Sequence, residues 1–326
     1  MISVCVIHFQ REVYVRGSKT VQNSKSKGGR VIRRAICSIT FALLLGIGLV
    51  AGAQAQGMAM EGYIDELVVH VKGSCANYES LAKRIVDANR ANGGDNWLAL
   101  TSTYGEGNVY RFASTRATYG EIETATAKFM AALSKGLGGE AGAMKLLGEL
   151  GACSESTQGI LRMRRWDLSL GKPADIAAYA KVIGGTRWIR LITVHVRPGM
   201  AGRYEAAVKS ANAAIMRANP DASNWFSQSV AGDNGTTYYI SQLRPSLAAF
   251  DGGQSMRTMM GDSAFEAYMK EISEVVTRTD VAIYQVSGSL SNEPDEVVAV
   301  APSFWRPKPP APPKPKTANP AAKKNQ

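Results

Sequence analysis

Histidine and cysteine are scarce in this chain, with three histidines and four cysteines among 326 residues. The sequence also contains no G-x-S-x-G motif, no P-loop, no H-E-x-x-H motif and no C-x-x-C pair. These absences argue against the common serine hydrolases, P-loop enzymes, zinc peptidases and dithiol redox proteins. A glycine-rich stretch at 136–142 follows a helical pattern instead of a strand, so it does not match a dinucleotide-binding fingerprint.

The net charge of +11 comes from the two ends of the chain. Residues 1–55 hold eight basic and one acidic residue, and residues 306–326 hold six basic residues and no acidic one. The intervening residues 56–305 hold 24 basic and 26 acidic residues. A nucleic-acid-binding domain needs a basic face on its folded part. We therefore expect no nucleic-acid partner.

A basic flank followed by an apolar run lies near the N-terminus. Arg33 and Arg34 precede the apolar residues 35–52, and a small-x-small sequence ends at Ala55. This pattern predicts a signal peptide over 31–55, cleaved after Ala55, and hence a periplasmic or secreted protein. The alternative is an uncleaved anchor in the inner membrane, because the apolar run approaches spanning length. We expect residues 1–30 to be a mis-annotated extension ahead of the true start.

The remaining chain contains one pattern twice. The stretch "ELVVHVKG" (66–73) returns as "LITVHVRPG" (191–199), and "RANGGDNW" (90–97) returns as "RANPDASNW" (217–225). Tyr110 likewise matches Tyr238. The offset between matched positions grows only from 125 to 128, so the insertions fall in loops. A match over so long a period indicates two copies of one domain.

Each copy predicts the same order of elements. An alternating strand is followed by an amphipathic helix, a hairpin, a second helical region and a last strand. We expect strands at 67–72, 96–104, 108–113, 160–167, 192–197, 224–230, 236–242 and 281–287. Ser263 to Glu266 resembles a capping box at the start of the second helix in the second copy. The order β-α-β-β-α-β is the ferredoxin-like motif of α+β proteins.

A strand ending in "VHVRPG", with "RYEAAVK" opening the next helix, is similar to the dimeric α+β barrel superfamily. That superfamily includes antibiotic-biosynthesis-type monooxygenases, stress-responsive barrel proteins and chlorite-dismutase-like haem proteins. The resemblance covers about 64–170 and 189–291. It implies two tandem ferredoxin-like units in one intramolecular, pseudo-dimeric α+β barrel, hence a monomer with pseudo-twofold symmetry. It supplies no catalytic motif.

The two histidines of the repeated strands fall on the same face. His70 alternates with the apolar row Leu67, Val69 and Val71, and His195 alternates with Ile192, Val194 and Val196. We expect the apolar rows to face the helices and both histidines to face the interior between the sheets. As ordinary interior residues they would simply form hydrogen bonds.

Six residues are candidates for binding a ligand in that interior. They are His70, His195, Trp97, Trp225, Tyr110 and Tyr238. Aromatic rings beside small residues leave room for a partly apolar molecule, although tryptophans also fill cores. The strand around Arg162, Arg164 and Arg165 offers either an anion-binding arginine or an edge strand protected by charge. We favour the edge strand.

After cleavage only Cys75 and Cys153 remain, and we expect them to form a disulfide in an exported protein. Strands one and four of the fold are neighbours, and both cysteines lie at the same end of that pair. With so few cysteines and histidines we expect no protein-only metal site and no cofactor.

Two segments lie outside the copies. Residues 171–188 predict a connecting helix, and residues 292–326 predict a Pro/Lys-rich disordered tail, with a tether to the cell envelope as the sharper alternative. We interpret the whole as an exported protein that binds a small, partly apolar ligand between its sheets. The alternatives are a cofactor-independent monooxygenase with a histidine base, a haem-binding barrel protein and an envelope-interaction protein.

Overall fold

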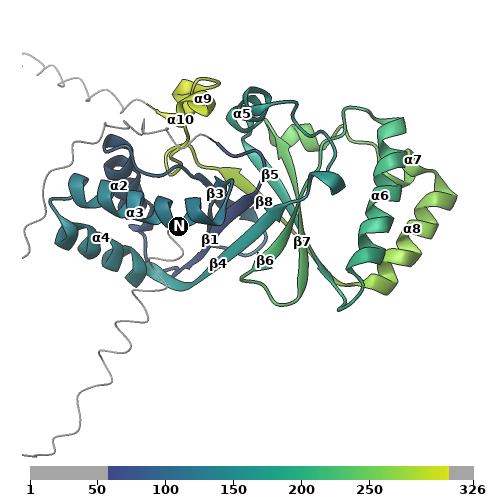
Figure 1. The fold of residues 1–326 in the computed structure, drawn as a ribbon, viewed down its shortest axis with the longest axis horizontal. Coiled ribbons are helices and arrows are strands. Elements are labelled where there is room, and N and C mark those ends of the chain that lie inside the picture. The colour runs from purple at the N-terminus through teal and green to yellow at the C-terminus, as the bar shows by residue number, and fades with distance from the viewer. Residues whose placement is uncertain (1–57, 308–326) are drawn as a thin grey trace, which may run out of the picture.

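The computed structural model describes residues 58–307, in which eight strands form one closed barrel (Figure 1). The barrel order is β1-β3-β2-β8-β5-β7-β6-β4, and every pairing is antiparallel. The strands are β1 (Tyr63–Val71), β2 (Leu98–Tyr104), β3 (Val109–Arg116), β4 (Ser154–Arg164), β5 (Trp188–Val196), β6 (Trp225–Ala231), β7 (Thr236–Arg244) and β8 (Val276–Val286).

Two sets of helices cover the outside of the barrel. The first unit contributes α2 (Tyr78–Ala91), α3 (Tyr119–Gly136) and α4 (Glu140–Cys153), and the second α6 (Ala201–Ala218), α7 (Met256–Met260) and α8 (Asp262–Val275). Figure 1 shows these two sets on opposite sides of the barrel. The remaining helices are α5 (Ile176–Gly185), α9 (Asp295–Val298) and α10 (Pro302–Trp305). Within residues 58–307, no helix combines the length and the apolar character that crossing a membrane requires.

Two seams close the barrel. Each unit forms a sheet of its own, with β1 and β3 or β5 and β7 at its centre. The outer strands then pair across the units, β2 with β8 and β4 with β6, for example at Thr101↔Gln285 and Met163↔Gln228. Closure leaves no open sheet edge, which removes a site of aggregation. The fold is therefore α+β, with two tandem ferredoxin-like units in one intramolecular barrel, as predicted.

Three apolar clusters hold this arrangement together. One lies between the first sheet and α2, α3 and α4, and another between the second sheet and α6 and α8. The third fills part of the barrel interior and continues beneath α5, α9 and α10. Val69 belongs to the first cluster and Val194 to the second, so the apolar rows of β1 and β5 face the helices as predicted.

Four strands, β1, β4, β5 and β8, begin earlier than the sequence pattern predicted. β1 starts at Tyr63 and β4 at Ser154, although we expected starts at 67 and 160. The strand pairing extends across polar residues because both neighbours supply hydrogen bonds there. The capping box at 263–266 was wrong, because α8 already begins at Asp262 and its N-cap residue, Gly261, has no side chain to accept a hydrogen bond.

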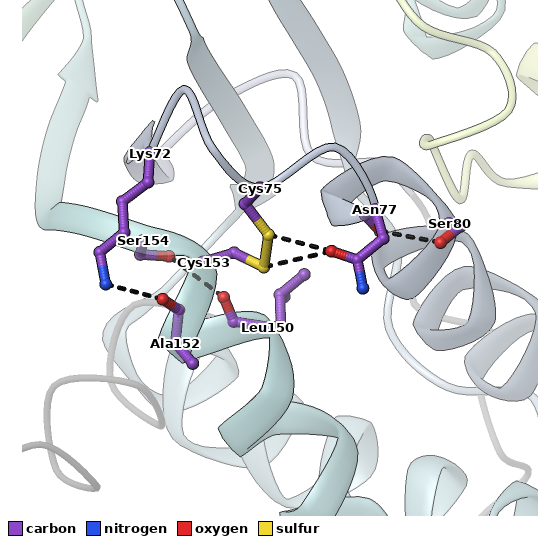
Figure 2. The surroundings of a disulfide bond; sticks show 8 residues. All are labelled: Lys72, Cys75, Asn77, Ser80, Leu150, Ala152, Cys153 and Ser154. Atoms are coloured by element: carbon purple, nitrogen blue, oxygen red, sulfur yellow. Dashed lines mark hydrogen bonds between the residues drawn. A yellow bond between two sulfur atoms is a disulfide. The ribbon is translucent and has the colours of Figure 1, made fainter.

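The predicted disulfide between Cys75 and Cys153 is present, with the two Cα atoms 5.4 Å apart (Figure 2). It ties the turn after β1 to the end of α4, immediately before β4. Lys72 reinforces the junction, because its Nζ donates to the Ala152 carbonyl at 2.8 Å and its backbone N–H donates to Cys153 at 2.9 Å. Asn77 Oδ1 lies 3.1 Å from the Cys75 sulfur.

The C-terminal segment is folded further than predicted. We expected a tail from 292 onward, but α9 and α10 pack on α5 at one end of the barrel, with Val297 and Trp305 buried. Gly184 permits this contact, because a Cβ there would lie 2.5 Å from the Cβ of Val300. Trp305 Nε1 donates to the Gly184 carbonyl at 3.1 Å. The predicted signal peptide and the predicted tail beyond 307 lie outside the described residues.

Candidate functional site

A cavity of about 530 Å³ opens at the end of the barrel opposite α9 and α10. Its walls are the inward rows of the strands, which combine apolar and polar side chains. The apolar lining is Val68, Val109, Ile160, Leu191, Val281 and Ala282, and the polar lining includes His70, His195, Arg111, Tyr239, Tyr284 and Thr193. Eight-stranded barrels have an interior that side chains fill or that holds one small ligand. Both histidines predicted to face the interior therefore line one cavity.

His70 stands near the mouth of this cavity. Its Nδ1 lies 3.0 Å from Oε1 of Glu106, in the turn that joins β2 and β3. Among the described residues no polar partner faces its Nε2. A carboxylate on Nδ1 fixes the ring and favours the tautomer with a free Nε2 lone pair. His70 therefore keeps one nitrogen for a ligand.

His195 occupies the equivalent place on β5 but has different partners. Its Nδ1 lies 3.3 Å from Thr237 Oγ1, and its Nε2 lies 3.4 Å from Asp280 Oδ2. Arg278 also binds Asp280, with Nε 2.8 Å from the same oxygen. Both nitrogens of His195 therefore have a neighbour in the protein. The two histidines are equivalent in position and different in chemistry.

A charged layer forms the floor of the cavity. Glu66, which is 1 % exposed, accepts from Arg111 at 2.9 Å and from Arg162 at 3.1 Å. Glu66 lies one residue before the predicted strand 67–72 and belongs to β1. One carboxylate between two guanidinium groups leaves the layer with a net positive charge. Buried ions remain charged only when such partners are close.

Two tyrosines flank the charged layer. The guanidinium of Arg162 lies 4.6 Å from the ring centre of Tyr239, and that of Arg111 lies 5.3 Å from the ring centre of Tyr284. The Tyr239 hydroxyl donates to Asp233 at 2.7 Å. Burial, and then this hydrogen bond, raise the pKa of Tyr239. Its hydroxyl therefore remains protonated at neutral pH.

The predicted tryptophan pair is not symmetric in space. Trp225 is inside the barrel, stacked 5.2 Å from Tyr179, and forms part of the wall at the covered end. Trp97 packs among the helix-side residues, 6.0 Å from Phe129, and donates to the Leu290 carbonyl at 2.7 Å. The strand pairing explains the difference. Ser241 of β7 and Ala113 of β3 are equivalent positions, and they pair with Trp225 and Leu98 respectively. Trp225 therefore occupies the place of Leu98 and not that of Trp97. A slip of one residue reverses the face of a strand side chain.

Tyr110 and Tyr238 are not inside the barrel either. Each packs against a tyrosine at the start of a helix, Tyr78 or Tyr204, with ring centres 4.7 Å apart in both units. The hydroxyl of Tyr110 donates to Glu79 at 2.8 Å. That of Tyr238 donates to Glu205 at 2.6 Å. This repeated contact joins sheet and helix in each unit, so the two tyrosines hold the framework and do not line the cavity.

The arginine strand was also interpreted wrongly as an edge. β4 pairs with both β1 and β6, so it is an interior strand of the closed barrel. Arg162 and Arg164 point inward, as their contacts with Glu66 and Tyr179 show. Arg165 points outward and binds Asp167 and Glu205, at 2.8 and 2.7 Å. Because β4 is paired on both sides in the closed barrel, Arg162 and Arg164 lie inside the barrel and do not protect an edge.

Sequence reasoning missed the charged floor and the covering segment. Glu66 and Arg111 lie on inward rows. Arg111 falls within the predicted strand 108–113, and period-2 alternation would have placed Glu66 on the row of His70 had the predicted strand 67–72 begun one residue earlier. Within residues 58–307, no group of three or more His, Cys, Asp and Glu residues could hold a metal ion. The arrangement can bind a small molecule through donors at the floor and the mouth, with apolar walls between them.

Neither a family model nor a curated protein matches this sequence. Several solved structures are similar at low identity. An anthrone oxidase-like protein is 13 % identical, with a TM-score of 0.45 and 71 % of this chain and 92 % of the other covered. A haem-binding protein of Thermus thermophilus is 8 % identical (TM-score 0.41; 71 % and 93 % covered). A chlorite dismutase mutant of Candidatus Nitrospira defluvii is 9 % identical (TM-score 0.37; 74 % and 95 % covered). Similarity this distant carries no information about activity.

Proposed function

We propose that this chain is an exported binding protein that holds a small, partly apolar molecule in the open cavity of its barrel. The cavity of about 530 Å³ carries this proposal. Ligand pockets of proteins measure roughly 300–1,000 Å³ and combine mostly apolar walls with a few polar groups. This cavity falls within that range of volumes, and its lining is divided about evenly between apolar and polar side chains.

The lining indicates what kind of molecule fits. Val109, Ile160 and Leu191 provide apolar contact along the walls, whereas Arg111 at the floor and His70 at the mouth provide polar contacts. A molecule with an apolar body and an acidic or strongly accepting group satisfies both. The positive floor favours an anionic group at the inner end.

Binding can be measured with 1-anilinonaphthalene-8-sulfonate, an apolar double ring with one anionic group. We expect one molecule to bind per chain. Thr193→Trp should abolish this binding by filling the cavity, because Thr193 lines it. His70→Ala should weaken binding by about tenfold, which corresponds to about 1.4 kcal/mol.

Tyr104→Ala is the matched control, because Tyr104 is 59 % exposed and lies outside the cavity lining. Equal binding by wild type and Thr193→Trp would reject the proposal. Native mass spectrometry of the exported protein gives a second, independent measurement, since a resident ligand should appear in wild type and be missing from Thr193→Trp.

A second candidate function is cofactor-independent oxygenation, and the pairing of His70 with Glu106 at 3.0 Å favours it. A histidine oriented by a carboxylate is a suitable general base for removing a proton from a phenolic substrate. Oxygen uptake with a quinol substrate tests this candidate. Uptake that persists in His70→Ala would exclude His70 as the base.

A further inference from the structure

A second cavity, of about 100 Å³, lies at the covered end of the barrel. The charged floor around Glu66 separates it from the open cavity, since Glu66 and Arg162 line the second and Arg111 lines the first. The walls of the second cavity include Ile183, Ile189, Leu191 and Trp225. The polar groups Arg164, Tyr179 and Glu293 also face it.

Arg164 is a cation without a counter-ion in this cavity. Its guanidinium donates to the Tyr179 hydroxyl at 3.0 Å and lies 5.1–5.9 Å from the ring centres of Trp166, Tyr179 and Trp225. Among the ion pairs of residues 58–307, none includes Arg164. Burial lowers the pKa of Arg164, yet an arginine stays charged under all physiological conditions. The guanidinium of Arg164 donates one hydrogen bond, to the Tyr179 hydroxyl, so most of its N–H groups remain available to a ligand.

Arg162 also lines this cavity and carries a buried donor without a partner among the described residues. The side chain is 5 % exposed, and its Nε is buried without a hydrogen-bond partner in the part of the chain that the structure describes. Its terminal nitrogens are occupied, by Glu66 at 3.1 Å and by Ser227 at 3.4 Å. A buried donor without a partner costs about 1–3 kcal/mol, so such groups normally have one.

Glu293 does not neutralise these arginines. The residue is 9 % exposed, and it forms no ion pair within residues 58–307. Burial raises the pKa of Glu293 to about 8, so the group is mostly protonated at neutral pH. A protonated carboxyl group has one O–H to donate. Arg164 and Glu293 therefore offer donors to a cavity whose other walls are mainly apolar and aromatic.

We infer that the covered cavity binds a small monocarboxylate, with its carboxylate on Arg164 and its apolar part against Trp225, Ile183 and Ile189. A carboxylate accepts two parallel hydrogen bonds from one guanidinium, which matches the free donors of Arg164. It also supplies the missing negative charge in a place where an isolated cation is costly. The inference concerns a different cavity from the proposed function and does not depend on it.

Benzoate is the probe, and benzamide is its neutral isostere. Trp166 and Trp225 flank Arg164, so binding should change the tryptophan fluorescence of the exported protein. We expect benzoate to bind at least tenfold more tightly than benzamide. Equal affinity for the two compounds would overturn the inference, as would displacement of benzoate by chloride at an equal concentration. This comparison needs no variant, so it stands even where a substitution prevents folding.

Variants locate the site. Arg164→Gln should weaken benzoate binding by at least tenfold, and Arg164→Lys should weaken it less because the charge remains. Arg203→Gln makes the same chemical change on the surface, where Arg203 binds Glu271 and Glu274, and should have no effect. His70→Ala should also leave benzoate binding unchanged. Loss of benzoate binding in His70→Ala with retention in Arg164→Gln would place the carboxylate in the open cavity and refute the inference.

Discussion

Residues in matching positions of the two units do different work. His70 keeps Nε2 free beside Glu106, whereas His195 is held by Thr237 and Asp280 through both ring nitrogens. The repeated strand motif was enough to predict that both histidines face the interior. It could not predict their partners, because Glu106 comes from the turn between β2 and β3, whereas Asp280 comes from β8. The chemical properties of each histidine depend on neighbouring side chains that differ between the two units.

Glu293 provides a pH-dependent prediction at the scale of one residue. The pKa of its buried carboxyl group is about 8, above its usual value of 4.5, so the folded protein holds a proton that the unfolded chain releases. The free energy of unfolding should therefore fall as pH rises from 4.5 to 8, by at most about 1.4 kcal/mol per pH unit, and level off above 8. Glu293→Gln should remove this slope.

Urea denaturation at pH 5 and at pH 7.5 measures the effect. The wild type should lose stability between the two values relative to Glu293→Gln, which should be the more stable protein at pH 7.5. Glu296→Gln is a suitable control, because Glu296 lies on the exposed surface of the same segment. Parallel pH profiles for wild type and Glu293→Gln would contradict the burial of a protonated carboxyl group.

At the scale of elements, the periodic pattern predicted the type and order of the strands and helices. It did not predict which face of the sheet every strand side chain takes. The strands and helices follow the expected β-α-β-β-α-β order, since apolar alternation and the 3.6-residue period are set by local burial. Trp97 and Trp225 showed where this reasoning fails. Each directly follows an asparagine, with an Arg-Ala-Asn sequence a few residues earlier, yet the strand ladders differ by one position and the two side chains point to opposite faces. The hydrogen-bond pairing between strands determines which face each side chain takes, and the match between the two sequences does not show that pairing.

The disulfide gives a prediction for the junction of three elements. Cys75 and Cys153 are 78 residues apart in sequence, and closing so long a loop stabilises the fold by about 4 kcal/mol on the chain-entropy estimate. The double variant Cys75→Ser/Cys153→Ser should lose about this much in urea denaturation. A reducing agent should lower the stability of the wild type and leave the double variant unchanged. Equal stability of oxidised and reduced wild type would show that the bridge contributes nothing.

The helix-facing rows of the strands give a second prediction at this scale. Val194 lies 6 % exposed beneath α6 and α8, so Val194→Asp would bury a carboxylate without a partner. Such a change typically costs several kcal/mol, and we expect loss of the cooperative thermal transition. Val230→Asp on β6 is the control, because Val230 is 44 % exposed, and it should fold normally. A folded Val194→Asp protein would contradict the assignment of this face.

At the scale of the whole molecule, closure explains what the sequence could not reveal. The arginine pattern of β4 suggests an edge when the strand is considered alone, and becomes interior charge only when β4 meets β6 of the other unit. The two seams thereby create both cavities and the charged floor between them. Local patterns predicted the two units and the apolar rows. The site depends on contacts between residues that are far apart in sequence, such as Glu66 with Arg111 and Arg162.

The last prediction concerns the C-terminal segment. Residues 292–307 of the predicted tail belong to the folded structure, and the rest of the tail lies outside the described residues. Val297 and Trp305 are 0 % and 1 % exposed and close one end of the barrel, so a chain ending at Ser291 should expose the apolar cluster under α5. Losing two large buried side chains typically costs several kcal/mol. A chain ending at Pro307 keeps both and should melt at the temperature of the full protein. Thermal denaturation of the two truncations compares them directly. If the chain ending at Ser291 were as stable as the one ending at Pro307, residues 292–305 would not belong to the folded core.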